Sequence, residues 1–288
     1  MGKRSKPRKH AKMEALIDVV MGTAGRFDMM EKAIDALYRE AQDNPINFYL
    51  IDNGSPMQEK VLHQHLFVYS PNKDAKGNVN WNTRRLPENM GFPISANEGA
   101  KMGKAPLIMF LSDDVTLQPG ALDKIIRDMD DPQVGIVGIK LLFPPDSVSP
   151  IRPAGKVQHI GIALNIRADP FHPLVGWSAM HPKCGVTRKD CFAVTGACFT
   201  IRRNLFEKAG MFNTMYGKGT YEDIDMCCRV REMGHGVMVD TEAIGYHYVG
   251  ATMEKRQEPF SLVENNARWQ TYWMGHPGIL QWDEYKYW

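Results

Sequence analysis

Two neighbouring acidic side chains that could hold a metal ion follow an apolar run in the middle of the chain. Residues 107–111 read Leu-Ile-Met-Phe-Leu, typical of a strand buried on both faces, and Ser112, Asp113 and Asp114 follow directly. The adjacent carboxylates repel each other, and Mg²⁺ or Mn²⁺ resolves that conflict by binding carboxylates and completing its shell with diphosphate oxygens. The alternative is that one aspartate caps the following turn. We expect a divalent metal near Asp114.

A second acidic cluster opens a predicted helix over residues 222–233. Glu222, Asp223 and Asp225 follow the glycine-rich segment 217–219. Acids in a first helical turn often only complement the helix dipole. Three acids within four residues exceed what capping needs, so a carboxylate here could act as general base toward an acceptor hydroxyl.

Two further side chains stand at the ends of predicted strands. Asp52 follows the strand-like run 48–51, where its carboxylate could accept the imide N–H of uracil or thymine. The alternative for Asp52 is a turn-forming role in the sequence Asp-Asn-Gly-Ser. His247 follows the strand-like segment 236–246, and an imidazole can complete the shell of a carboxylate-bound Mn²⁺. A buried core histidine is the alternative there.

Alternating strand and helix patterns must position these clusters. Strands are predicted over 16–21, 47–51 and 107–111, with a helix containing Met30, Ile34 and Leu37 after the first and a helix over 93–102 before the third. This spacing implies βαβ units and a mainly parallel sheet, whose ligands bind at the carboxyl ends of the strands. Further on we expect a helix through 129, strands over 134–139, 192–201 and 236–240, and irregular structure over 143–190.

Composition limits the broad class of the protein. The chain has 288 residues, 43% of them apolar, which suits one globular domain with a tail. Residues 1–12 hold six of the 35 Lys and Arg, so the remainder carries 29 basic against 33 acidic side chains. That balance excludes a basic, nucleic-acid-binding body. We expect residues 1–13 to be a disordered leader, with a tether to anionic lipid as the alternative.

The lengths of the apolar runs and the spacing of the cysteines indicate the cell compartment in which we expect the protein. No stretch approaches 18 consecutive apolar residues, and the first apolar run is six residues long. The five cysteines form no C-x2-C pair of the kind that zinc sites favour, so we expect reduced, mostly buried thiols. A cytoplasmic protein, at most peripheral to the inner face of a membrane, is the resulting expectation.

Read in order, these clusters and the short stretches between them form one pattern. The pattern resembles glycosyltransferase family 2, especially its bacterial rhamnosyltransferase-like branch, over roughly residues 15–250. The stretches are Asp18-Val19-Val20, Leu50-Ile51-Asp52-Asn53-Gly54-Ser55, Glu88-Asn89-Met90-Gly91-Phe92, Ala96-Asn97-Glu98-Gly99, Leu111-Ser112-Asp113-Asp114-Val115, Val194-Thr195-Gly196-Ala197-Cys198, Arg202-Arg203, Gly210-Met211-Phe212, Tyr221-Glu222-Asp223-Ile224-Asp225-Met226-Cys227-Cys228-Arg229, Gly234 and His247.

The resemblance implies a GT-A fold, with a Rossmann-like, mainly parallel sheet flanked by helices, an acceptor-side subregion and a C-terminal helical tail. We place this domain at residues 14–253 and an aromatic-rich extension at 254–288. Packing of that extension on the domain is expected, and an acceptor platform or a homodimer contact is the alternative.

The resemblance also implies roles for individual residues. Asp114 is the metal residue of a DxD-like motif and His247 completes the shell, while Asp223, next to Glu222, is the catalytic base. Ser112 departs from the family because Asp or Asn is common there, and Asn213 departs after Gly-Met-Phe. The donor-binding candidates are Thr23, Arg26, Asp52, Asn89 and Asp113, and the acceptor candidates are Trp177, His181 and Gly196.

The implied function is an inverting glycosyltransferase that uses Mn²⁺ or Mg²⁺. Asp52 favours a UDP-sugar or dTDP-sugar donor, and the acceptor is a hydroxyl of a glycan or another molecule. Two alternatives stay open: a catalytically silent module that binds a nucleotide sugar, and a nucleotidyltransferase. A nucleotidyltransferase would usually bring a glycine-rich, basic phosphate loop near its first strand, which residues 22–26 only faintly resemble.

Overall fold

The computed structural model describes residues 14–56, 78–248 and 262–276. The basic leader and the aromatic residues after 276 lie outside these ranges. Within them, no helix combines the length and the apolar composition that crossing a membrane requires.

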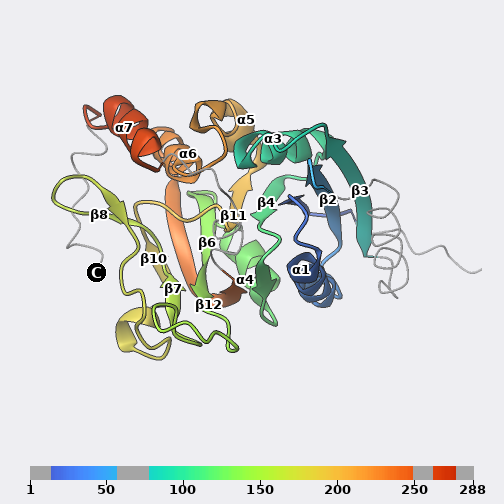
Figure 1. Ribbon diagram of the computed structural model, residues 1–288, viewed down its shortest axis with the longest axis horizontal. Coiled ribbons are helices and arrows are strands. Elements are labelled where there is room, and N and C mark those ends of the chain that lie inside the picture. The colour runs from blue at the N-terminus through green and yellow to red at the C-terminus, as the bar shows by residue number, and fades with distance from the viewer. Residues whose placement is uncertain (1–13, 57–77, 249–261, 277–288) are drawn as a thin grey trace, which may run out of the picture.

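Within the described ranges, one mixed sheet of ten strands forms the centre of the molecule (Figure 1). Its main path runs β10-β12-β6-β11-β4-β1-β2-β3, with β5 beside β12 and β7 beside β6. Six strands of that path run in one direction, namely β1 to β4, β6 and β12. The strands are β1 (Ile17–Thr23), β2 (Ile46–Asn53), β3 (Val79–Leu86), β4 (Leu107–Leu111), β5 (Val115–Leu117), β6 (Val134–Leu142), β7 (Val157–His159), β10 (Arg188–Asp190), β11 (Cys198–Arg202) and β12 (Gly236–His247).

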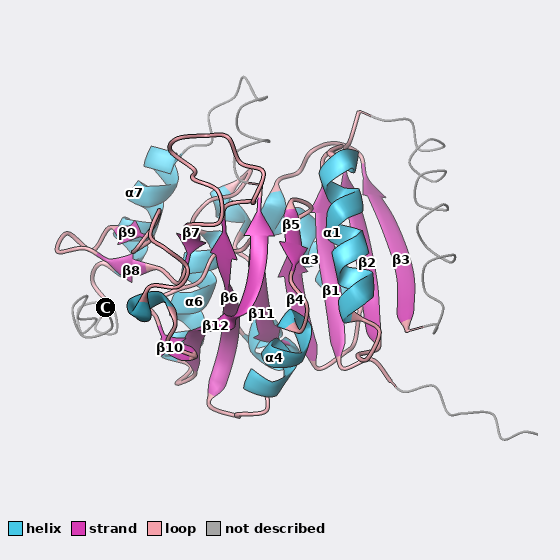
Figure 2. Ribbon diagram, turned by 90° about the horizontal axis from the view of Figure 1, so that it is seen from below, coloured by secondary structure: helices cyan, strands magenta, loops and turns pink. Residues whose placement is uncertain are grey.

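Helices cover both faces of this sheet. Figure 2 shows α1 and α4 in front of the sheet, and Figure 1 shows α3, α5, α6 and α7 on the other side. The predicted α/β fold with flanking helices is therefore confirmed. The helices are α1 (Phe27–Glu40), α3 (Phe92–Met102), α4 (Ala121–Asp128), α5 (Arg203–Lys208), α6 (Glu222–Glu232) and α7 (Leu262–Trp273), with short 3₁₀ turns η1 (Pro182–Cys184) and η2 (Thr214–Tyr216).

The sheet is buried between two apolar layers because its central strands are apolar on both sides. In β4, Ile108 and Phe110 face the core under α3 and α6, while Met109 and Leu111 face the core under α1 and α4. Successive side chains of a strand point to opposite faces, so a continuous apolar run suits a strand with helices on both sides. This is the strand expected over 107–111.

Two expected strands have other bounds in the structure, and the edge strand β3 was not expected. The strand expected over 192–201 begins only at Cys198, and residues 192–197 form a loop whose Gly196 N–H is bonded to Asp223 instead of to a neighbouring strand. The strand expected over 236–240 continues to His247 through an irregularity after Asp240. The edge strand β3 was missed altogether, because its sequence VNWNTRRL is mostly polar and largely exposed.

The segment expected to be irregular, 143–190, holds only short elements. Besides β7, η1 and β10 it contains a small hairpin of β8 (Ala163–Leu164) and β9 (Pro170–Phe171). Lys156 and Ser178 form an isolated bridge, so the segment folds back on itself beside β6.

Candidate active site

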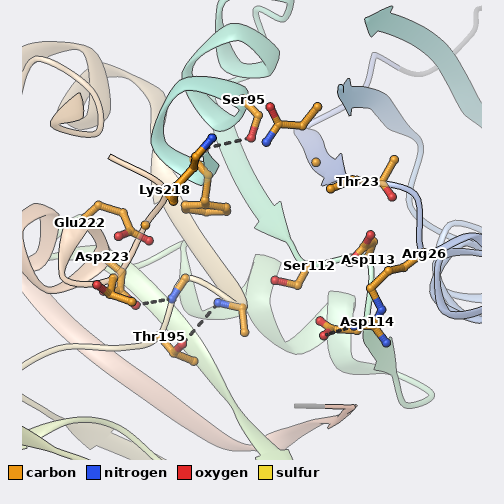
Figure 3. A pocket seen from close by; sticks show the side chains of 18 of the residues that line it. Thr23, Arg26, Ser95, Ser112, Asp113, Asp114, Thr195, Lys218, Glu222 and Asp223 are labelled. Carbon is orange, nitrogen blue, oxygen red and sulfur yellow. Dashed lines mark hydrogen bonds and ion pairs between the residues drawn. The ribbon is translucent and has the colours of Figure 1, made fainter. Parts of the chain in front are cut away.

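A pocket of about 340 Å³ lies at the carboxyl ends of β1 and β4. The last residues of β1, the turn after β4 and the end of β12 form one wall, and the first residues of α3 and α6 form the other. Figure 3 shows Arg26, Asp113 and Asp114 on one side and Lys218, Glu222 and Asp223 on the opposite side. Two charged walls therefore face each other across one cavity.

Asp114 is held between two groups of the first wall. Its Oδ2 pairs with the Arg26 guanidinium at 3.0 Å and its Oδ1 lies 3.3 Å from Nε2 of His247. The Nδ1 of His247 lies 3.3 Å from Oε1 of Gln158, which fixes the direction of the ring. Burial alone would raise the pKa of Asp114, but His247 and Arg26 lower it below its ordinary value. The carboxylate is thus kept charged.

These residues fit a divalent cation that is only partly coordinated by protein. An Asp oxygen and a His nitrogen facing each other are suitable ligands for Mn²⁺. Gln158 lies against the other ring nitrogen of His247, where a ligating His usually has a hydrogen-bond partner. Among the described residues, no group of three or more His, Cys, Asp or Glu side chains could hold a metal ion. Most of the shell would have to come from another molecule.

Asp113 has a different environment from its neighbour. Burial and the charge of Asp114 raise the pKa of the Asp113 carboxyl to about 7, and a hydrogen bond with Thr23 partly offsets this effect. The pKa of Asp113 is therefore raised while that of Asp114 is lowered. A cation would relieve the repulsion between the two carboxyl groups.

Asp223 stands on the second wall, at the start of α6. Its Oδ2 accepts a hydrogen bond from the backbone N–H of Gly196 at 2.7 Å, and its Oδ1 accepts one from Ile224 at 2.8 Å. Burial raises the pKa of Asp223, and burial together with the charge of Asp223 raises the pKa of Glu222 well above its ordinary value. A carboxylate that is oriented by backbone donors and is more basic than usual suits proton abstraction.

Asn89 is placed at the pocket by a small hydrogen-bond network at the end of β2. Asn53 Nδ2 donates to Asn89 Oδ1 at 3.2 Å, and Asn53 Oδ1 accepts from the Met90 N–H at 2.8 Å. Lys218 Nζ donates to the backbone oxygen of Asn89. The network joins the end of β2 to the segment that precedes α6.

Most residues expected at the site do line this pocket. They are Thr23, Arg26, Asn89, Asp113, Asp114, Gly196, Glu222, Asp223 and His247.

Three candidates do not line the pocket. Asp52 is 2% exposed, accepts from the Ser55 N–H at 2.8 Å and pairs with Arg85 at 2.9 Å. Trp177 and His181 stack edge to face on each other, with ring centroids 4.6 Å apart, and His181 also caps η1. Their roles stay predictions.

Several pocket residues were missed in the sequence. Lys218, Phe92 and Ser95 line the cavity, as do Asn53 and Thr195. Lys218 had a signal, because it is the single cation inside a glycine-rich segment directly before an acidic cluster. The others are small, apolar or neutral residues, so only the fold brings them to the cavity.

The family of the chain follows from comparison with known proteins. Residues 18–210 match the model of Glycosyl transferase family 2. The chain therefore belongs to this family, and a rhamnosyltransferase-like branch stays a prediction.

Two curated relatives are much longer than this chain. The uncharacterized protein y4gI of Sinorhizobium fredii is 24% identical over 278 residues, which cover 91% of this chain and 28% of that protein. The O-antigen biosynthesis protein RfbC of Myxococcus xanthus is 22% identical over 273 residues, covering 92% of this chain and 19% of RfbC. The chain thus spans less than a third of either relative.

Solved structures of glycosyltransferases share the fold. The crystal structure of GalNAc-T7 with UDP, GalNAc and Mn²⁺ matches 90% of this chain and 48% of its own, with a TM-score of 0.69 and 14% identity. The mannosyltransferase PcManGT from Pyrobaculum calidifontis, in complex with GDP-Man and Mn²⁺, matches 93% of this chain and 74% of its own, with a TM-score of 0.57 and 14% identity. The chain has the GT-A fold that these enzymes share.

Proposed function

We propose that this protein transfers a sugar from a nucleoside diphosphate sugar to a hydroxyl group of a glycan or another acceptor, with inversion at the anomeric carbon. The observation that carries the proposal is the pair of opposed walls in one pocket. Asp114 and His247 offer a cation site on one wall, and Asp223 offers a base on the other.

Asp114 and His247 would hold the metal, either Mn²⁺ or Mg²⁺. A bound divalent cation neutralises the negative charge that grows on a departing diphosphate. Arg26 and Lys218 are the further cations that line the pocket, one on each wall. Arg26 is placed to contact a diphosphate oxygen once Asp114 has another partner, because its guanidinium lies against that carboxylate.

Asp223 would take the proton from the acceptor hydroxyl. The N–H groups of Gly196 and Ile224 fix its two oxygens, and burial raises its pKa. The hydroxyl oxygen then attacks the anomeric carbon on the face opposite the diphosphate, the sugar–phosphate bond breaks, and the electron pair leaves with the diphosphate. Inversion follows from this single displacement.

The donor and the acceptor are proposed more broadly. Asp52 at the end of β2 supports a pyrimidine base, as in UDP or dTDP, although its pairing with Arg85 means that a base would have to share this carboxylate. GalNAc-T7 was solved with UDP, and PcManGT with GDP-Man. RfbC, named for O-antigen biosynthesis, supports a polysaccharide acceptor.

A thermal-shift screen of nucleotide sugars with Mn²⁺ and Mg²⁺ is the first experiment, followed by rate measurements on Asp223→Asn. We expect a metal-dependent shift with a UDP-sugar or dTDP-sugar. Asp223→Asn should keep that shift, and its rate of sugar transfer should fall about 10²–10⁴-fold, which is the usual contribution of a general base.

Full activity in Asp223→Asn would refute the base assignment. Donor binding without diphosphate release by the wild type, with acceptors present, would instead support a silent binding module.

A further inference from the structure

The segment that leads into the catalytic helix is held in an unusual backbone shape. Thr220 and Tyr221 have φ of 79° and 73°, although neither is a glycine, and Gly217 and Gly219 are also left-handed. The two carboxylates Glu222 and Asp223 follow immediately. Residues with side chains adopt this conformation only where their surroundings impose it. Something outside residues 216–221 must therefore hold them.

One side-chain amide on α7 contacts several polar groups of this segment. Asn265 is fully buried, and its Nδ2 lies 3.0 Å from the backbone oxygen of Tyr216, 2.9 Å from that of Gly219 and 3.2 Å from that of Thr220. The same nitrogen lies 3.0 Å from the Thr220 hydroxyl. Arg268 donates to the Asn265 Oδ1 at 2.7 Å. Because the carbonyl partners are acceptors and Arg268 is a donor, only one orientation of the amide fits.

The helix that carries Asn265 is firmly docked on α6. Trp269 and Trp273 are 0% and 1% exposed and belong to the core under α3 and α6. The Trp273 indole donates to Asp225 at 2.9 Å, only two residues after Asp223. Figure 1 shows α7 next to α6. Asn265 therefore lies on a helix that is anchored to the core and to α6 beside the segment before Glu222.

We propose that Asn265 is a positioning residue for the catalytic carboxylates. Its side-chain amide keeps residues 216–220 in the strained shape from which α6 begins, and so sets where Asp223 meets the acceptor hydroxyl. This inference rests on the proposed role of Asp223 as base. It also assigns α7, which lies beyond the family match at 18–210, a part in the active site.

The test compares Asn265→Asp with Gln270→Ala. Asn265→Asp keeps the shape of the side chain and removes its donor. Gln270→Ala removes a hydrogen bond from α7 to Asp169, a bond that none of residues 216–221 makes. With the UDP- or dTDP-sugar selected by the screen, we expect kcat to fall about 100-fold in Asn265→Asp, the size of loss that a misplaced catalytic group causes. The donor KM should stay within about threefold, because the metal wall is untouched. Gln270→Ala should keep the wild-type kcat.

A second variant covers the case in which Asn265→Asp does not fold. Arg268 is 42% exposed and orients the Asn265 amide through its Oδ1, so Arg268→Ala should fold and lower kcat about tenfold with an unchanged donor KM. Wild-type kcat in both Asn265→Asp and Arg268→Ala would overturn the inference. Equal losses in the Gln270→Ala control would also overturn it, because they would indicate general loosening of α7.

Hydrogen exchange separates failure of this inference from failure of the proposed function. Backbone amides of residues 216–222 should exchange faster in Asn265→Asp than in wild type or Gln270→Ala, without any ligand present. If the wild type transfers no sugar while this difference in exchange is found, the proposed function fails and the holding role of Asn265 stands. Unchanged exchange in Asn265→Asp would overturn that role whatever the activity.

Discussion

At the scale of single residues, Asp114 is the centre of the first wall. Arg26 pairs with one of its oxygens, and His247 lies against the other. A cation that binds Asp114 and His247 must take over part of this pairing. Arg26 would then be released toward the diphosphate, so metal and donor should strengthen each other's binding.

Mn²⁺-dependent binding of UDP tests this arrangement at the residue scale. We expect Asp114→Asn to abolish the Mn²⁺ dependence and His247→Ala to weaken Mn²⁺ binding about 10–100-fold, as loss of a ligand or its support does. His276→Ala is the control, since His276 pairs with Glu232 and does not line the pocket. Titration calorimetry with UDP, with and without Mn²⁺, gives the dependence on metal, and titration with Mn²⁺ in the presence of UDP gives the Mn²⁺ affinities. Equal Mn²⁺ affinity in His247→Ala and wild type would remove His247 from the metal site.

The second prediction at this scale concerns pH. Burial raises the pKa of Asp223 above 3.8, and a protonated carboxyl cannot accept the acceptor proton. The value of kcat/KM should therefore fall as pH decreases through a pKa above that of an ordinary aspartate. The residual rate of Asp223→Asn should lack this acidic limb. An acidic limb at or below pH 3.8 in the wild type would contradict the assignment.

Much of the residue-level site could be predicted because charged groups stand out in a sequence. Asp113, Asp114 and Asp223 follow apolar or glycine-rich segments, which is a local pattern. Asn265 and Asn53 could not be found that way. Neutral amides are common on any surface, and their importance here depends on which backbone atoms the fold brings to them.

At the scale of elements, the approach of α3 to the segment before α6 depends on a glycine. Gly91 has a φ of 89°, and a Cβ there would lie 2.3 Å from the backbone oxygen of Gly217 and 2.7 Å from Lys218 Cα. Phe92 N–H also donates to the Lys218 backbone oxygen at 3.1 Å. The two segments thus pack backbone against backbone.

Gly91→Ala and Gly155→Ala form a matched pair for this packing. Both glycines have positive φ, but a Cβ on Gly155 would meet nothing within 4 Å. Gly155→Ala should cost roughly 1–2 kcal/mol of unfolding free energy from the backbone alone. Gly91→Ala should cost more and lower kcat, because the segment before Glu222 must move. Denaturant unfolding and rate measurements check this, and equal stability losses in the two variants would contradict it.

The elements themselves divide into those with a strong periodic signal and those without. The strand at 107–111 was predicted from its continuous apolar run, and helices α1 and α6 were predicted from apolar residues at helical spacing. β3 lacks such a signal because it is an edge strand with exposed Asn and Arg side chains. The true start of β11 depends on Gly196 binding Asp223, a contact between residues 27 positions apart.

At the scale of the whole molecule, α4 and β12 meet through two buried carboxyl groups. Asp128 and Asp240 are both 0% exposed, with Arg188 2.7 Å from Asp128 and Arg127 3.5 Å from Asp240. Burial and the neighbouring Asp240 raise the pKa of Asp128 to about 6. A proton on Asp128 therefore relieves the repulsion between the two carboxyl groups.

This pair predicts how stability depends on pH. The folded-state pKa of Asp128 lies above its ordinary 3.8, so the folded protein holds a proton that the unfolded chain releases between those values. The resulting stabilisation is present at low pH and is lost as pH rises through about 6. Wild type should therefore gain stability relative to Asp128→Asn when the pH is lowered from about 7.5 to about 5.

Melting temperatures at the two pH values measure that difference. Asp130→Asn, which replaces an exposed aspartate next to α4, is the control and should follow the wild type at both pH values. A wild-type advantage that grows with rising pH would contradict the proton-sharing pair.

The five buried cysteines allow the opening of different parts of the fold to be measured by thiol labelling. All five are free thiols without exposure, and burial raises the pKa of Cys191 and Cys198 to about 12. A thiol reagent can reach them only in molecules that have opened. Cys227 and Cys228 lie on α6 just after Asp223, while Cys198 lies in β11 at the middle of the sheet. Labelling rates at these positions would separate the release of the catalytic helix from the opening of the whole fold. A cysteine introduced at an exposed site would be the one labelled with a dye while the protein stays folded.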